Sequence, residues 1–256
     1  MAIKTKKKIH EKNHKLTIHT KSLKLSTMCT LEKRGSLFIL TLISDDHEHR
    51  LGPSLIDFLL SALSQVNSQA INGGFALITV AHGKFFCNSF DVPWGQSDAR
   101  SCLHQMVDSF KSVMSALLSL PVPTIAAISG HAAAGELVLA LGRDYVLMRR
   151  DCGFLYMSEV DLAMTLLEYI AALMRSKIEG SAARRDVLLK GMKVKGEEAV
   201  RMGIVDFATH DSEESVVEVA VRLGDMWNGM LRCMQRLGRA CIRRYVVCLD
   251  WFRKPL

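Results

Sequence analysis

The sequence contains no long uninterrupted apolar run, no CxxC pair and no HExxH motif. Its most apolar stretch, residues 125–141, is interrupted by His131 and Glu136, so we expect no membrane-spanning helix. The odd number of cysteines, seven, and the lack of an apolar signal segment favour reduced thiols in an intracellular compartment. The nine histidines show no paired zinc spacing, so no metal site is expected.

Acidic residues are scarce at both ends of the chain. Residues 1–27 carry a net charge of +7, and residues 232–256 carry +6. Because the whole chain also carries +7, the part between these ends carries −6. This acidic body argues against a specific nucleic-acid partner. Nonspecific binding of polyanions by the two ends stays open, and it predicts a steep salt dependence that deleting both ends removes.

The rest of the composition is that of a folded protein. With 256 residues, 49% of them hydrophobic, the chain is long enough for one large domain or two small ones. The lysine-rich residues 1–27 have no apolar period and are predicted to be a disordered extension. Two alternatives for this segment stay open: a targeting peptide, and a gene-model extension in which Met28 is the initiator.

Apolar runs and helical spacing predict strands that alternate with helices. Strands are expected at residues 36–43, 75–81, 124–129 and 145–148, and helices at about 53–71, 101–120 and 136–141. Loops are expected at 82–94, 130–135 and 153–165, followed mostly by helix to about residue 229. This order predicts a largely parallel α/β core with a helical C-terminal third.

The loop at residues 130–135 is the most informative of the three. It is a run of glycine and alanine that opens a helix, and its exposed backbone N–H groups suit an anion or a developing oxyanion. In parallel α/β sheets, ligands gather at the carboxyl ends of strands, where such loops meet. Close packing of the helix on a strand also requires small residues, so both interpretations stay open at this point.

A series of motifs between residue 28 and about residue 223 matches one known family. The motifs are MCTLEKRG (28–35), EHRLGPSLID (48–57), HGKFF (82–86), PTIAAISGHAAAG (123–135), DYVLMR (144–149), YMSEVDL (156–162), ALMRSK (172–177) and AARRDVLLKGMKVKGEEAVRMGIVD (182–206). On these motifs the chain resembles the crotonase (enoyl-CoA hydratase/isomerase) superfamily, and within it the plant Δ3,Δ2-enoyl-CoA isomerases.

The resemblance implies an α/β fold, a crotonase-like spiral of ββα units with a helical C-terminal region. The core is then expected at residues 28–206 and the helical region at 207–256. The family implies an acyl-CoA thioester substrate and a homotrimer or hexamer. No separate cofactor is expected, because coenzyme A is part of the substrate. The implied activity converts 3-enoyl-CoA to trans-2-enoyl-CoA in fatty-acid β-oxidation.

The family's site residues fall on the three loops. The resemblance places the base at Glu159, and the two backbone N–H groups of an oxyanion hole at Asn88 and Gly135. Glu159 is expected to move a proton from C2 to C4, helped by an apolar pocket that raises its pKa. The residues expected to contact the substrate are Cys87, Ser89, Phe90, Asp91, Val92, Ala134 and Leu162.

Departures from the family pattern leave alternatives open. Hydratases of the family carry a second glutamate where this chain has Val138, which favours an isomerase over the hydratase alternative. Ser89 replaces a glycine, and Glu136 adds a negative charge that would oppose an enolate unless it points away. A catalytically degenerate acyl-CoA-binding or interaction protein is therefore also considered. The implied compartment is the peroxisome, but the final KPL differs from the usual signal, so the cytoplasm is the alternative.

Overall fold

A computed structural model of the chain describes residues 22–23, 28–44, 48–70, 75–88, 90–91, 99–161, 164–208 and 211–237. The larger sheet contains, in spatial order, β1 (Ser22–Leu23), β2 (Cys29–Arg34), β3 (Leu37–Leu42), β4 (Ala76–Ala81), β6 (Thr124–Ile128), β8 (Tyr145–Met148) and β10 (Phe207–Ala208). The smaller sheet contains β5 (Phe85–Asn88), β7 (His131–Ala133) and β9 (Leu155–Tyr156). The helices are α1 (Pro53–Ala70), α3 (Ala99–Leu118), α4 (Gly135–Leu141), α5 (Glu168–Lys177), α6 (Ser181–Leu188), α7 (Gly196–Arg201) and α8 (Glu213–Leu237).

The larger sheet confirms the predicted α/β class. Its first three strands pair antiparallel, and β3, β4, β6, β8 and β10 then pair parallel. The four strands expected from apolar runs are present within one or two residues of their predicted ends. The strand β2 was not predicted, because its sequence CTLEKR ends in charged residues and contains no continuous apolar run. Of the segment 1–27, the structure describes Ser22 and Leu23, which pair with β2.

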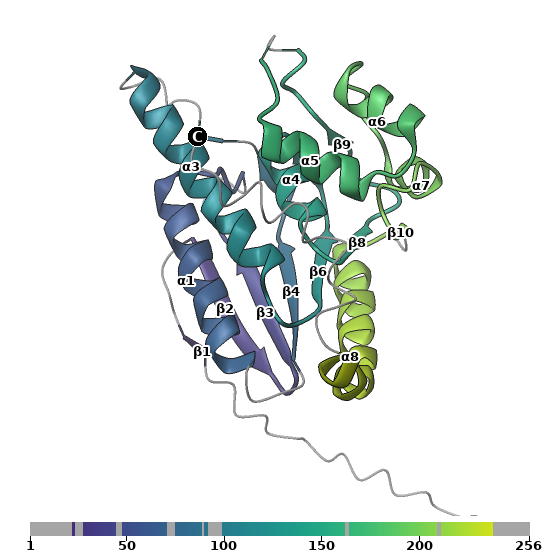
Figure 1. Ribbon diagram of the computed structural model, residues 1–256. Coiled ribbons are helices and arrows are strands. Elements are labelled where there is room, and N and C mark those ends of the chain that lie inside the picture. Colours follow the sequence, from purple (N-terminus) through teal and green to yellow (C-terminus); the bar gives the residue numbers. More distant parts are fainter. Residues whose placement is uncertain are drawn as a thin grey trace, which may run out of the picture.

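Helices cover both faces of the larger sheet. The helices α1 and α3 lie on one face, and α8 lies on the other (Figure 1). The buried side of α1 carries Leu55, Leu59 and Leu63, whose spacing is that of one helical face. On the opposite face of the sheet, Ile78 and Ile125 pack with Val216 of α8. Alternate residues of each central strand therefore enter two separate hydrophobic clusters.

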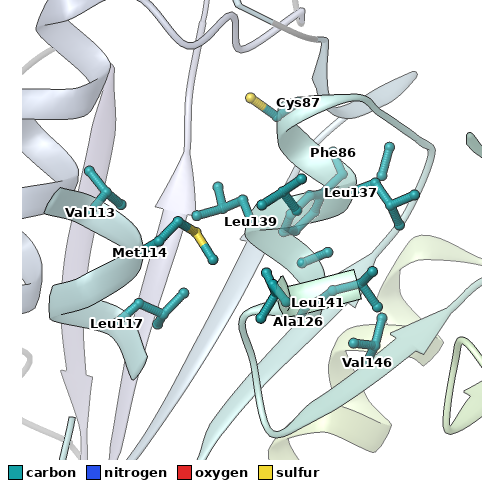
Figure 2. Packing of buried hydrophobic residues seen from close by; sticks show 14 of the residues in the cluster. Phe86, Cys87, Val113, Met114, Leu117, Ala126, Leu137, Leu139, Leu141 and Val146 are labelled. Atoms are coloured by element: carbon teal, nitrogen blue, oxygen red, sulfur yellow. The ribbon is translucent and has the colours of Figure 1, made fainter. Parts of the chain in front are cut away.

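The short helix α4 is entirely buried, and all of its residues except Gly135 and Glu136 are apolar. Every one of its residues, from Gly135 to Leu141, is buried. Figure 2 shows Leu137, Leu139 and Leu141 packed among side chains of α3, of β5 and of the larger sheet. A helix that is fully enclosed in this way has little freedom to shift. The packing thus fixes its first residue, Gly135, relative to the strands around it.

The smaller sheet replaces segments that were expected to be loops. Its strands are two to four residues long, and two glycines let their first residues approach closely. A Cβ added to Gly130 would lie 2.0 Å from the carbonyl oxygen of Lys84, and one added to Gly153 would lie 2.1 Å from that of Gly130. Gly153 also has φ +84°, which glycine adopts far more readily than other residues. Backbone packing, rather than an apolar run, thus brings these three strands together.

Arg143 is a buried cation that the sequence analysis did not single out. Its side chain is fully buried, and Nε and Nη2 donate to the Thr79 hydroxyl at 3.3 and 2.8 Å. Nη1 has no hydrogen-bond partner among the described residues. Burial lowers the pKa of the guanidinium to about 9. The charge of Asp144 opposes this lowering only in part, so the buried cation is expected to cost stability.

We therefore expect Arg143→Met to raise the free energy of unfolding by about 1–4 kcal/mol, because an apolar side chain of similar length needs no charge compensation. Urea unfolding measures this change. Thr79→Val is the matched control with the opposite sign, and it should destabilise the protein by about 1–3 kcal/mol by leaving the cation without its acceptor. A loss of stability in Arg143→Met would contradict the assignment of Arg143 as a net cost.

Candidate active site

The predicted base and the two predicted oxyanion-hole residues lie at, or shortly after, the carboxyl ends of three adjacent strands. Asn88 at the end of β5 pairs with Ala133 of β7, which pairs with Tyr156 of β9. The N–H of Ala134 also donates to the carbonyl of Tyr156 at 2.9 Å. Gly135 comes two residues after Ala133, and Glu159 three residues after Tyr156. The parallel pairing of the small sheet thus gathers the segments that carry Asn88, Gly135 and Glu159 at one edge.

Glu159 lies in a turn that follows β9. The N–H of Asp161 donates to the carbonyl of Ser158 at 3.1 Å, and the N–H of Met164 donates to the carbonyl of Glu159 at 2.8 Å. The carboxylate oxygen Oε2 is buried and has no hydrogen-bond partner among the described residues. Burial raises the pKa of this carboxyl, and a hydrogen bond from its own backbone opposes the change only in part. A poorly solvated carboxylate of this kind is suited to accept a proton.

The backbone at Ala134 and Gly135 is unusual in two ways. Ala134 has φ +53°, a conformation that L-residues seldom adopt, and such strain often marks functional sites. Gly135 is the first residue of α4, so its N–H has no acceptor within the helix. A Cβ on Gly135 would lie only 3.1 Å from atoms of Leu51 and Phe90. The position therefore favours glycine, and its N–H requires an acceptor outside the helix.

The side chain of Asn88 is held by a charged pair that the sequence analysis did not assign a role. Its amide nitrogen donates to Oε2 of Glu48 at 3.2 Å, and Nε of Arg50 donates to the same oxygen at 2.6 Å. Glu48 and Arg50 belong to the motif EHRLG, which was quoted only for the resemblance. The contact with Asn88 spans 40 residues, so no local spacing indicates it.

Phe90 and Asp91 form a wall beside Gly135. Phe90 makes a bridge to Leu51, and the N–H of Asp91 donates to the carbonyl of Leu51 at 3.2 Å. The ring of Phe90 packs edge-on against Phe110, with ring centres 5.2 Å apart. Phe90 and Asp91 are both half-buried. The other residues predicted to contact substrate in this region and near the base, namely Ser89, Val92 and Leu162, lie outside the described residues.

Cys87 and Glu136 are both fully buried, and they are near enough for the charge of Glu136 to act on the Cys87 thiol. The Cys87 thiol donates to the carbonyl of His49. Burial, and then the charge of Glu136, raises the pKa of Cys87 well above its usual value. Because Cys87 is fully buried, its side chain is not exposed to a substrate as the sequence analysis expected. Val138, at the position of the hydratase glutamate, is also fully buried.

Neither a metal-binding cluster nor a membrane-spanning helix is found among the described residues. No group of three or more histidine, cysteine, aspartate or glutamate side chains there has the geometry to hold a metal ion. No helix among the described residues is both long and apolar enough to cross a membrane.

Comparison with known proteins identifies the family. A family model described as enoyl-CoA hydratase/isomerase matches residues 32–240. The Arabidopsis thaliana protein named enoyl-CoA delta isomerase 2, peroxisomal, is 56% identical over 212 residues, which cover 79% of this chain and 88% of that relative. A second Arabidopsis thaliana protein, enoyl-CoA delta isomerase 1, peroxisomal, is 47% identical over 199 residues, which cover 77% of this chain and 81% of the relative.

Solved structures share the fold at low sequence identity. An apo enoyl-CoA isomerase of Mycobacterium tuberculosis superposes with a TM-score of 0.78 at 21% identity, and covers 89% of this chain and 95% of its own. A second structure of the same Mycobacterium tuberculosis protein, described there as a probable enoyl-CoA hydratase, superposes with a TM-score of 0.79 at 22% identity, with coverages of 88% and 91%. The architecture, the row of strand ends and these matches agree, and the chain belongs to the enoyl-CoA hydratase/isomerase family.

Proposed function

We propose that the chain is a Δ3,Δ2-enoyl-CoA isomerase that converts 3-enoyl-CoA to trans-2-enoyl-CoA in fatty-acid degradation. The observation that carries this proposal is the Glu159 carboxylate, which has a raised pKa and a buried oxygen without a partner among the described residues. The segments that bear Asn88 and Gly135 lie at the same edge of the small sheet. The names of the Arabidopsis relatives support the same activity.

The reaction needs one base that both takes and returns a proton. Glu159 removes a proton from C2, and the electrons of that C–H bond form a dienolate that extends over C2, C3 and C4. The backbone N–H groups of Asn88 and Gly135 donate to the thioester oxygen as it gains negative charge, each contributing about 2.7–4 kcal/mol by comparison with measured oxyanion holes. The protonated Glu159 then returns its proton to C4, which leaves the double bond between C2 and C3.

The position of Val138 favours isomerisation over hydration. Adding water across a double bond requires a group to activate the water as well as a group to protonate carbon. Val138 is apolar and fully buried, so it supplies no such group. Glu136 does not replace it, because its side chain is fully buried inside the protein. We therefore assign the reaction to a single carboxylate.

A turnover assay on purified protein tests the proposal. We expect conversion of a 3-enoyl-CoA to trans-2-enoyl-CoA, with little hydration of crotonyl-CoA in a parallel assay. Binding of a saturated acyl-CoA, measured by calorimetry, completes the comparison. Folded protein that binds acyl-CoA but converts no 3-enoyl-CoA would instead support the degenerate alternative. Efficient hydration of crotonyl-CoA would support the hydratase.

The pH dependence of kcat/KM should report the raised pKa of Glu159. The carboxyl must be ionised to accept the C2 proton, so kcat/KM should fall as the pH decreases through the pKa of the free enzyme. Because burial raises that pKa above the ordinary value of 4.5, the midpoint of the fall should lie above 4.5. A pH profile of kcat/KM, checked by circular dichroism for unfolding, gives this midpoint. A midpoint at or below 4.5 would contradict the assignment of Glu159.

The cellular setting follows from the same proposal. The substrate is an acyl-CoA thioester, no separate cofactor is needed, and the active form is a trimer or a dimer of trimers. Two of the Arabidopsis relatives are named peroxisomal, which supports a peroxisomal site of action for this chain. A fluorescent fusion that leaves the C-terminus free tests the compartment, and light scattering of the purified protein tests the trimer. Diffuse cytoplasmic fluorescence would favour the alternative compartment.

A further inference from the structure

The segment that leads into α1 contacts the chain on both sides of Asn88. After Asn88, the N–H of Asp91 donates to the carbonyl of Leu51 at 3.2 Å. Before it, the Cys87 thiol donates to the carbonyl of His49. The stretch of chain that carries one proposed oxyanion donor is therefore fastened to a segment about 40 positions earlier in the sequence.

Asn88 itself is held by a carboxylate of the same segment. Its side-chain nitrogen donates to Oε2 of Glu48 at 3.2 Å, and Nε of Arg50 donates to the same oxygen at 2.6 Å. Nη2 of Arg50 also donates to it. The side chains of Glu48 and Arg50 are 29% and 38% exposed, so water competes with these contacts only in part. Hydrogen bonds to an ionised acceptor are stronger than those between neutral groups.

The segment that carries this carboxylate is itself rigidly held. His49 is buried and has φ +52°, its N–H donates to the Ser44 hydroxyl at 3.0 Å, and its ring Nε2 donates to the carbonyl of His82 at 3.0 Å. Such a conformation persists only where the surrounding contacts over-determine it. Leu51 is fully buried. A carboxylate on a fixed segment can restrain the residue that it binds.

Asn88 lies where the pairing of its own strand stops. It is the last residue of β5, and its pairing with Ala133 is the last one between β5 and β7. The side chain and the N–H of a residue are both attached at the same Cα, and the peptide unit that carries the N–H is planar. A hydrogen bond to the side chain therefore limits how far the N–H can turn at a position where strand pairing alone holds one side.

We propose that Glu48 and Arg50 form an anchor that fixes the direction of the Asn88 N–H. In this anchor Glu48 is a positioning residue, which acts through the side chain of Asn88, and Arg50 keeps the carboxylate in place. The proposal rests on the proposed isomerase function for its catalytic consequence. It adds a role for the side chain of Asn88, whose backbone alone is used by the oxyanion hole.

Positioning matters here because the N–H group acts on charge that develops in the transition state. Fixed donors are effective because they need no reorganisation when the charge appears. A displacement of about 1 Å can cost up to about 10²-fold in rate. Loosening the anchor should therefore lower kcat more than it raises KM, since the ground-state thioester depends less on this donor.

Three variants and one control separate positioning from a general charge effect. Glu48→Ala and Asn88→Ala remove the same hydrogen bond from its two sides, so either one tests the anchor if the other does not fold. Glu48→Gln keeps an acceptor oxygen. Glu32→Ala is the matched control, because Glu32 also accepts from Nε and Nη2 of an arginine two residues away, Arg34, at 3.0 and 2.7 Å. Its side chain is 29% exposed, as is that of Glu48, but it lies in β2.

We expect Glu48→Ala and Asn88→Ala each to lower kcat by about 10- to 100-fold, with KM changed by less than about threefold. In protein that already carries Asn88→Ala, Glu48→Ala should lower kcat no further, because the contact is already lost. Glu48→Gln and Glu32→Ala should retain kcat within about threefold of wild type. Folded Glu48→Ala protein with wild-type kcat would overturn the anchor. So would additive losses in the double variant, or a change confined to KM, since either would mean that Glu48 acts without Asn88.

Hydrogen exchange measured by mass spectrometry provides a readout that does not depend on turnover. The anchor predicts faster exchange in a peptide that covers residues 85–91 in Glu48→Ala, but not in Glu32→Ala. If the wild-type protein does not isomerise 3-enoyl-CoA, the proposed function fails, and the exchange comparison alone decides whether the anchor exists. Unchanged exchange of this peptide in Glu48→Ala would overturn the anchor even if the wild-type enzyme is active.

Discussion

Glu159→Gln should lower kcat/KM for 3-enoyl-CoA by about 10²- to 10⁴-fold, the range that a positioned general acid–base group contributes. The amide keeps the size and shape of the carboxylate but has no basic oxygen to take the C2 proton. The same group must also return the proton at C4, so the substitution blocks both proton transfers of the proposed reaction. A stopped-time assay of trans-2-enoyl-CoA formation measures the loss.

Asp161→Asn is the matched control for this prediction. Asp161 lies two residues from Glu159 in the same turn, and its side chain is exposed. The asparagine removes one negative charge from the loop and leaves the proposed base unchanged. The value of kcat/KM should therefore stay within about threefold of wild type. Equal losses in the two variants would indicate a general charge effect rather than a base at position 159.

Glu159→Gln should also make the protein more stable at neutral pH. The pKa of Glu159 is raised in the folded state, so its stabilising contribution is present below the unfolded pKa and is lost as the pH rises through the folded pKa. Glutamine does not ionise, so the stability advantage of Glu159→Gln should grow over that window and then level off. Urea unfolding of both proteins at several pH values tests this, and an advantage confined to acidic pH would contradict it. Such a gain with lost activity is typical of a residue kept for catalysis.

The larger sheet and its helices could be predicted from local patterns. The strands β3, β4, β6 and β8 are buried on both faces by helices, so their sequences are continuous apolar runs. In α1, leucines at helical spacing indicated the buried face. These signals are local, because each strand or helix must bury its own apolar surface whatever its neighbours are.

The smaller sheet and the contacts around the site could not be predicted in this way. Strands of two to four residues are too short to show a period, and small residues such as those of β7 are equally typical of a turn. The contacts of Asn88 with Glu48 and of Cys87 with His49 join residues 40 and 38 positions apart. Family resemblance indicated Glu159, Asn88 and Gly135, but the residues that hold them depend on side chains that meet only in the folded chain.

Glu136 departs from the family pattern in sequence, and the structure shows where its side chain lies. From the sequence, its charge was expected to oppose an enolate unless the side chain pointed away. In the structure the carboxylate is fully buried, and its charge contributes to the raised pKa values of Cys87 and of Tyr156. Burial of a carboxylate is costly, so Glu136 is expected to lower the stability of the fold relative to an apolar residue at this position.

Gly153→Ala should cost about 3 kcal/mol or more of unfolding free energy, at the upper end of single-residue effects. Two effects combine at this position. Gly153 has φ +84°, and an added Cβ would lie 2.1 Å from the carbonyl oxygen and 2.4 Å from the carbonyl carbon of Gly130. Neither atom can move alone, because Gly130 in turn lies against the carbonyl of Lys84. Urea unfolding of the purified variant measures the loss.

Gly35→Ala separates the two effects. Gly35 also has positive φ, +58°, but an added Cβ would meet no atom within 4 Å. Its cost should therefore be the conformational strain alone, about 1–2 kcal/mol. The additional loss of unfolding free energy in Gly153→Ala then measures the contribution of the close backbone contacts where β5, β7 and β9 begin. Because β9 leads into Glu159 and β7 into Gly135, any relaxation of that overlap moves the base relative to the oxyanion donors. Folded Gly153→Ala protein should thus also lose kcat, whereas equal stability losses and unchanged kcat in the two variants would show that the close backbone packing is not required.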